Sequence, residues 1–237
     1  MSIKAILFDL DGTLVPMDQD VFVQDYFKRI SKYLVPHGYE PKQLTDIIWK
    51  GTAAMIKNNS GKSNEDIFWD TAASVYGDKI IADKPLFDEF YEQEFDKIKA
   101  VCGLNPKARD TVYALKQQGY RVALATNPVF PKRATQWRIT WANLQPQDFE
   151  FYTTYENINS CKPNLKYYKE VALRLGIDTG ECLMVGNDVD DDMVAQNVGM
   201  KTFLLTDCLI NKSNEDISKY PNGSFDELIE YINKIDA

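Results

Sequence analysis

The sequence of 237 residues has little positive charge, few cysteines, a single histidine and no long apolar run. Its 27 Lys and Arg residues are outnumbered by 35 Asp and Glu residues, which gives a formal net charge of −8. A surface of that sign repels nucleic-acid phosphates and anionic lipids, so we expect neither as a partner. Without an apolar run of about 18 residues, we expect no membrane-spanning helix. We also expect no secretory signal, because no basic and then apolar leader precedes the first predicted strand.

The cysteines, Cys102, Cys161, Cys182 and Cys208, are scattered and form no C-x-x-C pair. Their spacing therefore gives no support to zinc ligation or to thioredoxin-like chemistry. Thiols without a disulfide framework favour a reducing compartment, and we expect a cytoplasmic protein. The single histidine, His37, lies in a Pro-His-Gly turn, which disfavours mechanisms that need a histidine base.

Segment 3–13 is the most informative in the chain. It begins as an apolar run, which predicts a strand buried on both faces, and it ends in two acids and a glycine. Asp9 and Asp11 leave the strand on the same side, because side chains alternate along a strand, and Gly12 permits a sharp turn. Two carboxylates held close together repel unless a cation lies between them, and Mg2+ prefers such oxygen ligands. Alternatively, Asp-x-Asp-Gly is turn chemistry, in which aspartate caps backbone N–H groups.

Residues 18–98 carry apolar side chains at helical spacing and contain no predicted strand. Prolines and capping residues mark where helices begin, including Ser63-Asn64-Glu65-Asp66, which resembles a capping box. The pattern predicts helices over 18–34, 41–56, 63–75 and 83–98. We interpret this segment as an inserted four-helix unit whose many aromatic side chains form its core.

From residue 99 onward, strand and helix patterns alternate. Strands are predicted over 121–126, 151–154, 182–186 and 201–205. Helices are predicted over 105–119, 131–140, 163–175 and 192–198, with a last one from Ser224. This alternation indicates a parallel sheet with helices on both faces. The predicted fold class is therefore α/β: a discontinuous Rossmann-like core of residues 1–17 and 99–237 that carries the inserted helical domain 18–98.

Polar side chains recur where the predicted strands end. One strand ends in Thr126-Asn127, another ends in Gly186-Asn187-Asp188 with further acids up to Asp192, and Lys162 precedes a helix between them. The carboxyl ends of parallel strands lie at one edge of a sheet, where open α/β sheets bind ligands. Each group also has a local explanation, as a turn, a solvated loop charge or a helix cap. Their arrival at successive strand ends favours a shared site.

This ordered set of motifs resembles the haloacid dehalogenase superfamily of phosphohydrolases. The resemblance spans most of the chain, and the helical insert is similar to the superfamily's small α-helical cap. The motifs that carry it are Asp9-Leu10-Asp11-Gly12-Thr13 for the first, Thr126 for the second, Lys162-Pro163 for the third and Gly186 to Asp192 for the fourth.

The resemblance implies roles for these residues. Asp9 is expected to attack phosphorus and form an aspartyl-phosphate, and Asp11 to protonate the leaving oxygen and then deprotonate the water. Lys162 is expected to neutralise charge beside the nucleophile, and Thr126 and Asn127 to hold the phosphoryl oxygens. The implied cofactor is Mg2+, bound by Asp9, the backbone carbonyl of Asp11 and an acid of the fourth motif.

The fourth motif departs from the family pattern, which usually has Gly-Asp where this chain has Gly-Asn-Asp. Asp188 is therefore the first candidate for the metal ligand and Asp192 the second, while Asp191 stays open. If Asn187 takes the usual position of the acid, the resemblance implies a less anionic site and weaker metal binding.

An aspartate at position 11 favours phosphoryl chemistry over carbon–halogen cleavage, because a halide leaves without a proton. The resemblance thus implies a Mg2+-dependent phosphatase that hydrolyses a small phosphorylated metabolite through an aspartyl-phosphate, as a monomer or homodimer. A phosphomutase of the same superfamily and a phosphate-binding protein with vestigial activity are the alternatives. The insert is expected to select the leaving group. Asp18, Tyr26 and Trp49 are conceivable contacts there, although packing or exposure is the simpler interpretation.

Overall fold

The computed structural model describes residues 2–235 and contains a five-stranded sheet in the order β2-β1-β3-β4-β5. Every pairing between neighbouring strands is parallel. The buried apolar side chains of β1 suit a strand that is paired on both edges and covered on both faces. The predicted α/β class with a parallel sheet is confirmed. The strands are β1 (Ala5–Phe8), β2 (Arg121–Leu124), β3 (Cys182–Gly186), β4 (Lys201–Leu205) and β5 (Asn222–Gly223).

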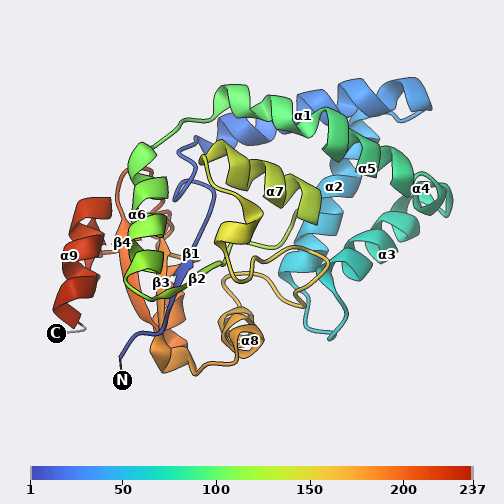
Figure 1. Cartoon of the computed structure of the whole chain (residues 1–237). Coiled ribbons are helices and arrows are strands. Elements are labelled where there is room, and N and C mark those ends of the chain that lie inside the picture. The colour runs from blue at the N-terminus through green and yellow to red at the C-terminus, as the bar shows by residue number, and fades with distance from the viewer. Residues whose placement is uncertain (1, 236–237) are drawn as a thin grey trace.

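Helices cover both faces of the sheet (Figure 1). The α-helices that follow the insert are α6 (Pro106–Gln117), α7 (Lys132–Trp141), α8 (Leu165–Leu175) and α9 (Phe225–Ile235), and the 3-10 helices are η3 (Pro146–Asp148), η4 (Thr179–Glu181), η5 (Met193–Val198) and η6 (Ile217–Lys219). Ile6 and Phe8 of β1 share a core with α6 and α9, whereas Ala5 and Leu7 share one with α8 and η5. Successive β1 side chains thus serve opposite faces, as the period of a strand requires.

The segment between β1 and α6 is helical, as predicted. Its elements are α1 (Gln19–Leu34), η1 (Val35–His37), α2 (Pro41–Ile56), α3 (Asn64–Tyr76), α4 (Lys79–Ala82), α5 (Lys84–Gln93) and η2 (Phe95–Val101). The short α4 was not predicted, and the predicted helix over 83–98 is wrong in its second half, where the chain tightens into η2. Phe95 and Ile98 are both fully buried there, and a 3-10 helix aligns residues three apart on one side.

Two elements of the predicted core also differ. The predicted strand over 151–154 is reduced to one bridge between Tyr152 and Leu124, because the Asn157 side chain accepts the Thr154 N–H and turns the chain. The helix predicted over 192–198 is present as the 3-10 helix η5 (Met193–Val198) and not as an α-helix. The short edge strand β5 was not predicted. The other predicted strands and helices after residue 99 are present within a few residues of their expected bounds.

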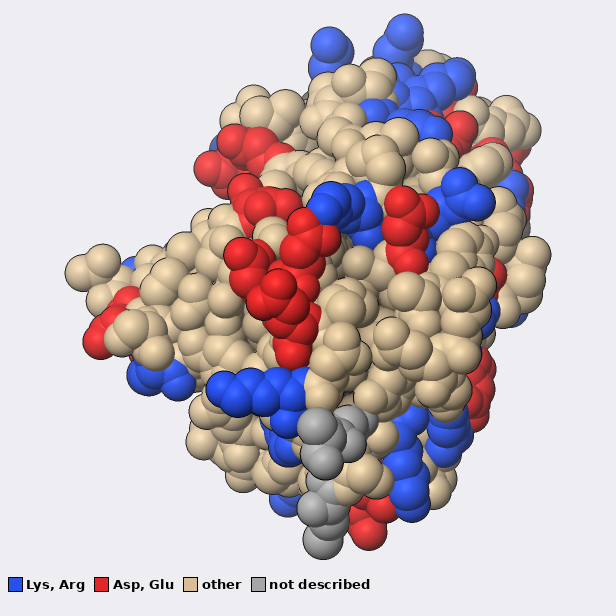
Figure 2. Space-filling view, turned by 60° about the vertical axis from the view of Figure 1, so that its left-hand side comes forward, with Lys and Arg blue, Asp and Glu red and all other residues tan. Residues whose placement is uncertain are grey.

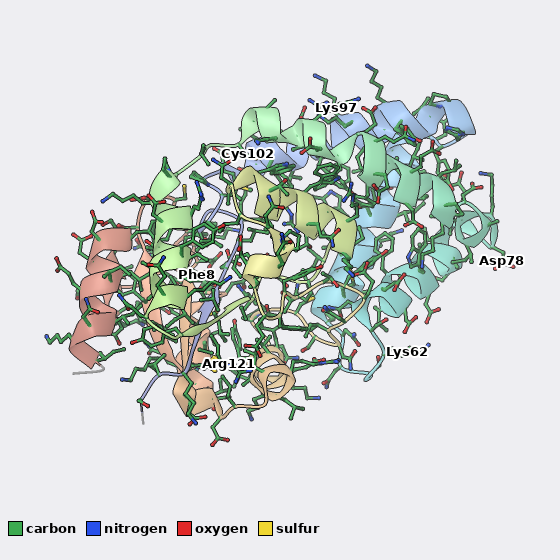
Figure 3. The ribbon with its side chains drawn as sticks, in the orientation of Figure 1. Phe8, Lys62, Asp78, Lys97, Cys102 and Arg121 are labelled. Atoms are coloured by element: carbon green, nitrogen blue, oxygen red, sulfur yellow. The ribbon has the colours of Figure 1, made fainter. Side chains whose placement is uncertain are left out.

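The insert packs directly against the core through aromatic side chains. Phe95 of η2 stacks on Trp141 of α7 with ring centroids 5.7 Å apart, and Phe22 of α1 meets Phe130 edge-on at 6.1 Å. In Figure 3, Phe8 lies within the sheet region and Cys102 at the junction with the insert, while Lys62 and Asp78 mark the insert's outer edge. The division into a core and a separate domain 18–98 remains a prediction.

Charges of both signs cover the surface, and acidic side chains gather across the middle of the face shown in Figure 2. Within residues 2–235, no helix combines the length and the apolar character needed to cross a lipid bilayer.

Candidate active site

The sheet and a sharp turn place the first two acids. Asp9 follows β1 directly, and its N–H donates to the Val185 carbonyl of β3 at 2.8 Å, so its backbone is held by the sheet. Gly12 has φ +80°, and a Cβ there would lie 2.3 Å from Asn187 Nδ2. Glycine is therefore required twice at this position, for its backbone conformation and for the close approach of the fourth motif.

Lys162 connects the first motif to the fourth. Its side chain is buried, and Nζ donates to Asp9 Oδ1 at 2.8 Å and to Asp192 Oδ1 at 2.6 Å. Burial alone lowers the pKa of Lys162, but the carboxylates of Asp192 and Asp9 outweigh it and raise that pKa well above its usual value. The lysine is therefore a fixed positive charge beside the candidate nucleophile.

Arg138 of α7 holds Asp11, a contact that sequence reasoning missed. The guanidinium is fully buried and forms an ion pair with Asp11 Oδ2, and it lies 4.6 Å from the Phe130 ring centroid. The other carboxylate oxygen, Asp11 Oδ1, is buried and has no hydrogen-bond partner within residues 2–235. Burial raises the pKa of Asp11, and Arg138 opposes this shift. The sequence signal that could have pointed to this contact is the presence of an arginine on the buried face of α7.

Thr126 and Asn127 follow β2 at the same edge of the sheet. The Thr126 carbonyl accepts hydrogen bonds from the Thr153 and Tyr167 hydroxyls at 2.6 and 2.8 Å, which fixes the backbone there. The Asn127 amide nitrogen donates to Asp191 Oδ2 at 3.4 Å. Its amide oxygen is buried without a hydrogen-bond partner in the described part of the chain.

The fourth motif forms a tight acidic loop after β3. Asn187 Oδ1 accepts the Thr13 hydroxyl at 2.9 Å, so the amide ties this loop to the first motif. Both carboxylate oxygens of Asp192 are occupied, one by Lys162 and the other by the Asp188 N–H at 3.0 Å. Asp188 Oδ1 accepts the N–H groups of Asp190 and Asp191.

A cavity of about 300 Å³ brings the predicted residues together. The insert contributes Phe22 and Val23 to its wall, and Lys212 also lines it. The predicted site residues that line it are Asp9, Asp11, Thr126, Asn127, Lys162, Asp188, Asp191 and Asp192.

The donor set of this cavity suits a hard divalent cation that keeps several water ligands. Burial raises the pKa of Asp188, and it raises that of Asp191 to about 6, with Asp9 adding to both shifts. A bound cation relieves this mutual repulsion. No ready-made cluster of three His, Cys, Asp or Glu ligands exists within residues 2–235. Mg2+ is commonly held by one or two carboxylates together with water and substrate phosphate, so the residues fit it.

A family profile for haloacid dehalogenase-like hydrolases matches residues 3–199, a range that includes every motif described above. The chain belongs to this family. The resemblance inferred from the motifs is therefore confirmed, and the protein is a hydrolase with a helical insert after its first motif.

Relatives with named activities are similar to this chain over nearly its whole length. A pyrophosphatase, PpaX, from Bacillus mycoides is 22% identical over 239 residues and covers 100% of both chains. A glyceraldehyde 3-phosphate phosphatase from Methanothermobacter thermautotrophicus is 25% identical over 235 residues and covers 98% of each. Among solved structures, a HAD family enzyme from Bacteroides thetaiotaomicron in complex with magnesium and inorganic phosphate has a TM-score of 0.52 and 22% identity. It covers 92% of this chain and 98% of that one.

Proposed function

We propose that the protein is a Mg2+-dependent phosphatase that hydrolyses a small phosphorylated metabolite through an aspartyl-phosphate intermediate. The main support is the contact of Asp9 with the buried ammonium of Lys162 in a cavity that Asp11 also lines. The fixed positive charge lets a phosphate dianion approach a carboxylate nucleophile. The phosphatase names of relatives agree with this proposal.

In the first step, a carboxylate oxygen of Asp9 forms a bond to phosphorus while the bond to the leaving oxygen breaks. Asp9 Oδ2 is the less constrained oxygen, because it accepts the Thr13 hydroxyl at 3.3 Å, whereas Lys162 Nζ holds Oδ1 at 2.8 Å. Asp11 gives a proton to the leaving oxygen. It then accepts one from the water that attacks the aspartyl-phosphate, so Asp9 and phosphate are released and Asp11 regains its proton.

The metal ligands proposed are Asp9, the backbone carbonyl of Asp11 and Asp188. When bound, Mg2+ draws negative charge from the phosphoryl oxygens. Asp192 was the second candidate from the sequence, but hydrogen bonds already occupy both of its carboxylate oxygens, which favours Asp188. Asp191 lines the same cavity and is the remaining alternative.

The test is release of inorganic phosphate from a panel of sugar phosphates, nucleotides and phospho-acids, with Mg2+ and with a chelator. With Mg2+, we expect phosphate to be released in proportion to the substrate lost. With a chelator, we expect no release. Asp9→Asn should abolish release while the circular dichroism spectrum stays unchanged, and Asp78→Asn, at an exposed acid of the insert, serves as the matched control. Substrate rearrangement without free phosphate would identify a phosphomutase. Binding without turnover would identify a phosphate-binding protein, and full activity in Asp9→Asn would refute the nucleophile.

A further inference from the structure

A second cavity of about 140 Å³ lies between the insert and the segment that follows β2. Helices α1, α2, α3 and α5 contribute to its wall. Its lining is mainly aromatic and includes Tyr26, Trp49, Phe68, Trp69, Phe130 and Tyr155. An apolar cavity of about 150 Å³ inside a protein is large enough to bind benzene. The space therefore suits one aromatic ring.

The aromatic cavity adjoins the acidic cavity of the active site. Val23, Val129 and Phe130 line both spaces. Phe130 meets Tyr26 edge-on at 5.4 Å within the aromatic cavity, and the Arg138 guanidinium, which holds Asp11, lies over the same Phe130 ring. The Arg138 guanidinium thus contacts both Phe130, at the border between the cavities, and Asp11, the acid proposed to protonate the leaving oxygen.

The polar groups of the aromatic cavity offer little to a polyol or to an anion. The Tyr26 and Tyr91 hydroxyls bond each other at 2.9 Å, so together they keep one hydrogen to donate. Trp69 Nε1, which is buried without a hydrogen-bond partner in the described residues, adds one N–H donor. Asp88 is the charged residue of the lining, and no Lys or Arg from residues 2–235 lines the cavity. A sugar would leave hydroxyls unpaired there, and a second phosphate would meet an acid instead of a cation.

We propose that the aromatic cavity binds the leaving group and that the substrates are phosphate monoesters of aromatic alcohols. The proposal rests on the phosphatase function above. The phosphoryl group lies at Asp9, its ester oxygen faces Asp11, and the ring passes Phe130 into the space that Trp49 and Trp69 line. Binding energy from the ring then holds the ester in line with the nucleophile.

The test compares benzyl phosphate with glycerol 3-phosphate in the full chain with Mg2+. Both are esters of alkyl alcohols of similar acidity, so a difference between them reports on binding more than on leaving-group chemistry. We expect kcat/KM to favour benzyl phosphate by about tenfold or more, the order that apolar pockets achieve. Equal values, or a preference for glycerol 3-phosphate, would overturn the aromatic class while leaving the phosphatase function standing. No release from any ester would instead refute the phosphatase function.

A pair of substitutions on α2 tests whether the preference for benzyl phosphate arises in the aromatic cavity. Thr52 lines the aromatic cavity, whereas Ala53 is exposed on the same helix. Thr52→Phe fills the cavity and should lower the ratio of benzyl to glycerol phosphate kcat/KM about tenfold. Ala53→Phe adds the same ring outside and should keep both rates. A ratio unchanged by Thr52→Phe in a folded protein would overturn the proposal.

Ligand binding without turnover gives an independent measurement if Thr52→Phe does not fold. Trp49 and Trp69 line the cavity, so benzylphosphonate should change the tryptophan fluorescence of the unaltered protein, and Trp49→Phe should reduce that change. Methylphosphonate has the same head group without the ring and should produce a smaller change. Equal responses to the two phosphonates would count against a ring in the cavity, whether or not any ester is hydrolysed.

Discussion

Replacing Lys162 with methionine tests the charge balance at the end of β1. The change keeps most of the side-chain volume but removes the ammonium that joins Asp9 and Asp192. The exposed fractions of the Lys162 and Asp192 side chains, 2% and 1%, leave little water to screen the remaining carboxylates. Removing one partner of a buried ion pair costs about 3–5 kcal/mol. That is a large part of the stability of a typical protein, about 5–15 kcal/mol.

A second substitution separates lost charge balance from lost packing. Lys162→Met with Asp192→Asn should recover much of the stability, because one of the two facing carboxylates becomes neutral and its amide oxygen still accepts the Asp188 N–H. Phosphate release should stay low in both variants, since the positive charge beside Asp9 is absent. Urea unfolding followed by tryptophan fluorescence measures the free energies, and Lys166→Met, at an exposed site on α8, is the control, expected within about 0.5 kcal/mol of the parent. The reasoning is refuted if Lys162→Met costs no more than this control, or if Asp192→Asn deepens the loss.

Two further substitutions test other contacts of the site. Arg138→Lys keeps the charge but loses the planar guanidinium that holds Asp11. We expect kcat to fall on the order of 100-fold, because a small displacement of a catalytic group costs about that much in rate. KM should change little. Arg133→Lys, on the partly exposed side of the same helix, should change neither, and an unaltered kcat in Arg138→Lys would count against the positioning role. Gly12→Ala adds backbone strain of about 1–3 kcal/mol and a clash with Asn187, whereas Gly119→Ala has a similar φ of +92° and open space around it. Thermal unfolding should therefore show a larger loss for Gly12→Ala, and equal losses would show that Asn187 moves aside freely.

The sheet and the composition of the site were predictable because their signals are local. The buried run of β1 and the acids after it stand side by side in the sequence, and parallel topology brings the other strand ends to the same edge. Lys162 could be assigned to the site only through this topology, because it lies 153 positions from Asp9 in the sequence.

The contact of Arg138 with Asp11 was not predictable, because helical periodicity says that a position is inward but not what it meets. The bends at η2 and in 151–154 have a similar origin. At η2 the burial of Phe95 and Ile98 on one side decides the backbone, and beyond Tyr152 the hydrogen bond from the Thr154 N–H to the Asn157 side chain decides it. Both depend on tertiary neighbours that a window of sequence does not contain.

The position of β1 between β2 and β3 also has a consequence for the order of assembly. Its Ala5 pairs with Arg121 on one edge and with Cys182 on the other. At a synthesis rate of about 5–20 residues per second, Cys182 leaves the ribosome roughly ten seconds or more after Ala5. Until then, one edge of an almost wholly apolar strand stays open to unwanted pairing, and Asp192, which shares Lys162 with Asp9, has not yet been added to the chain. Phosphate release during translation would thus mark the moment when β3 has docked.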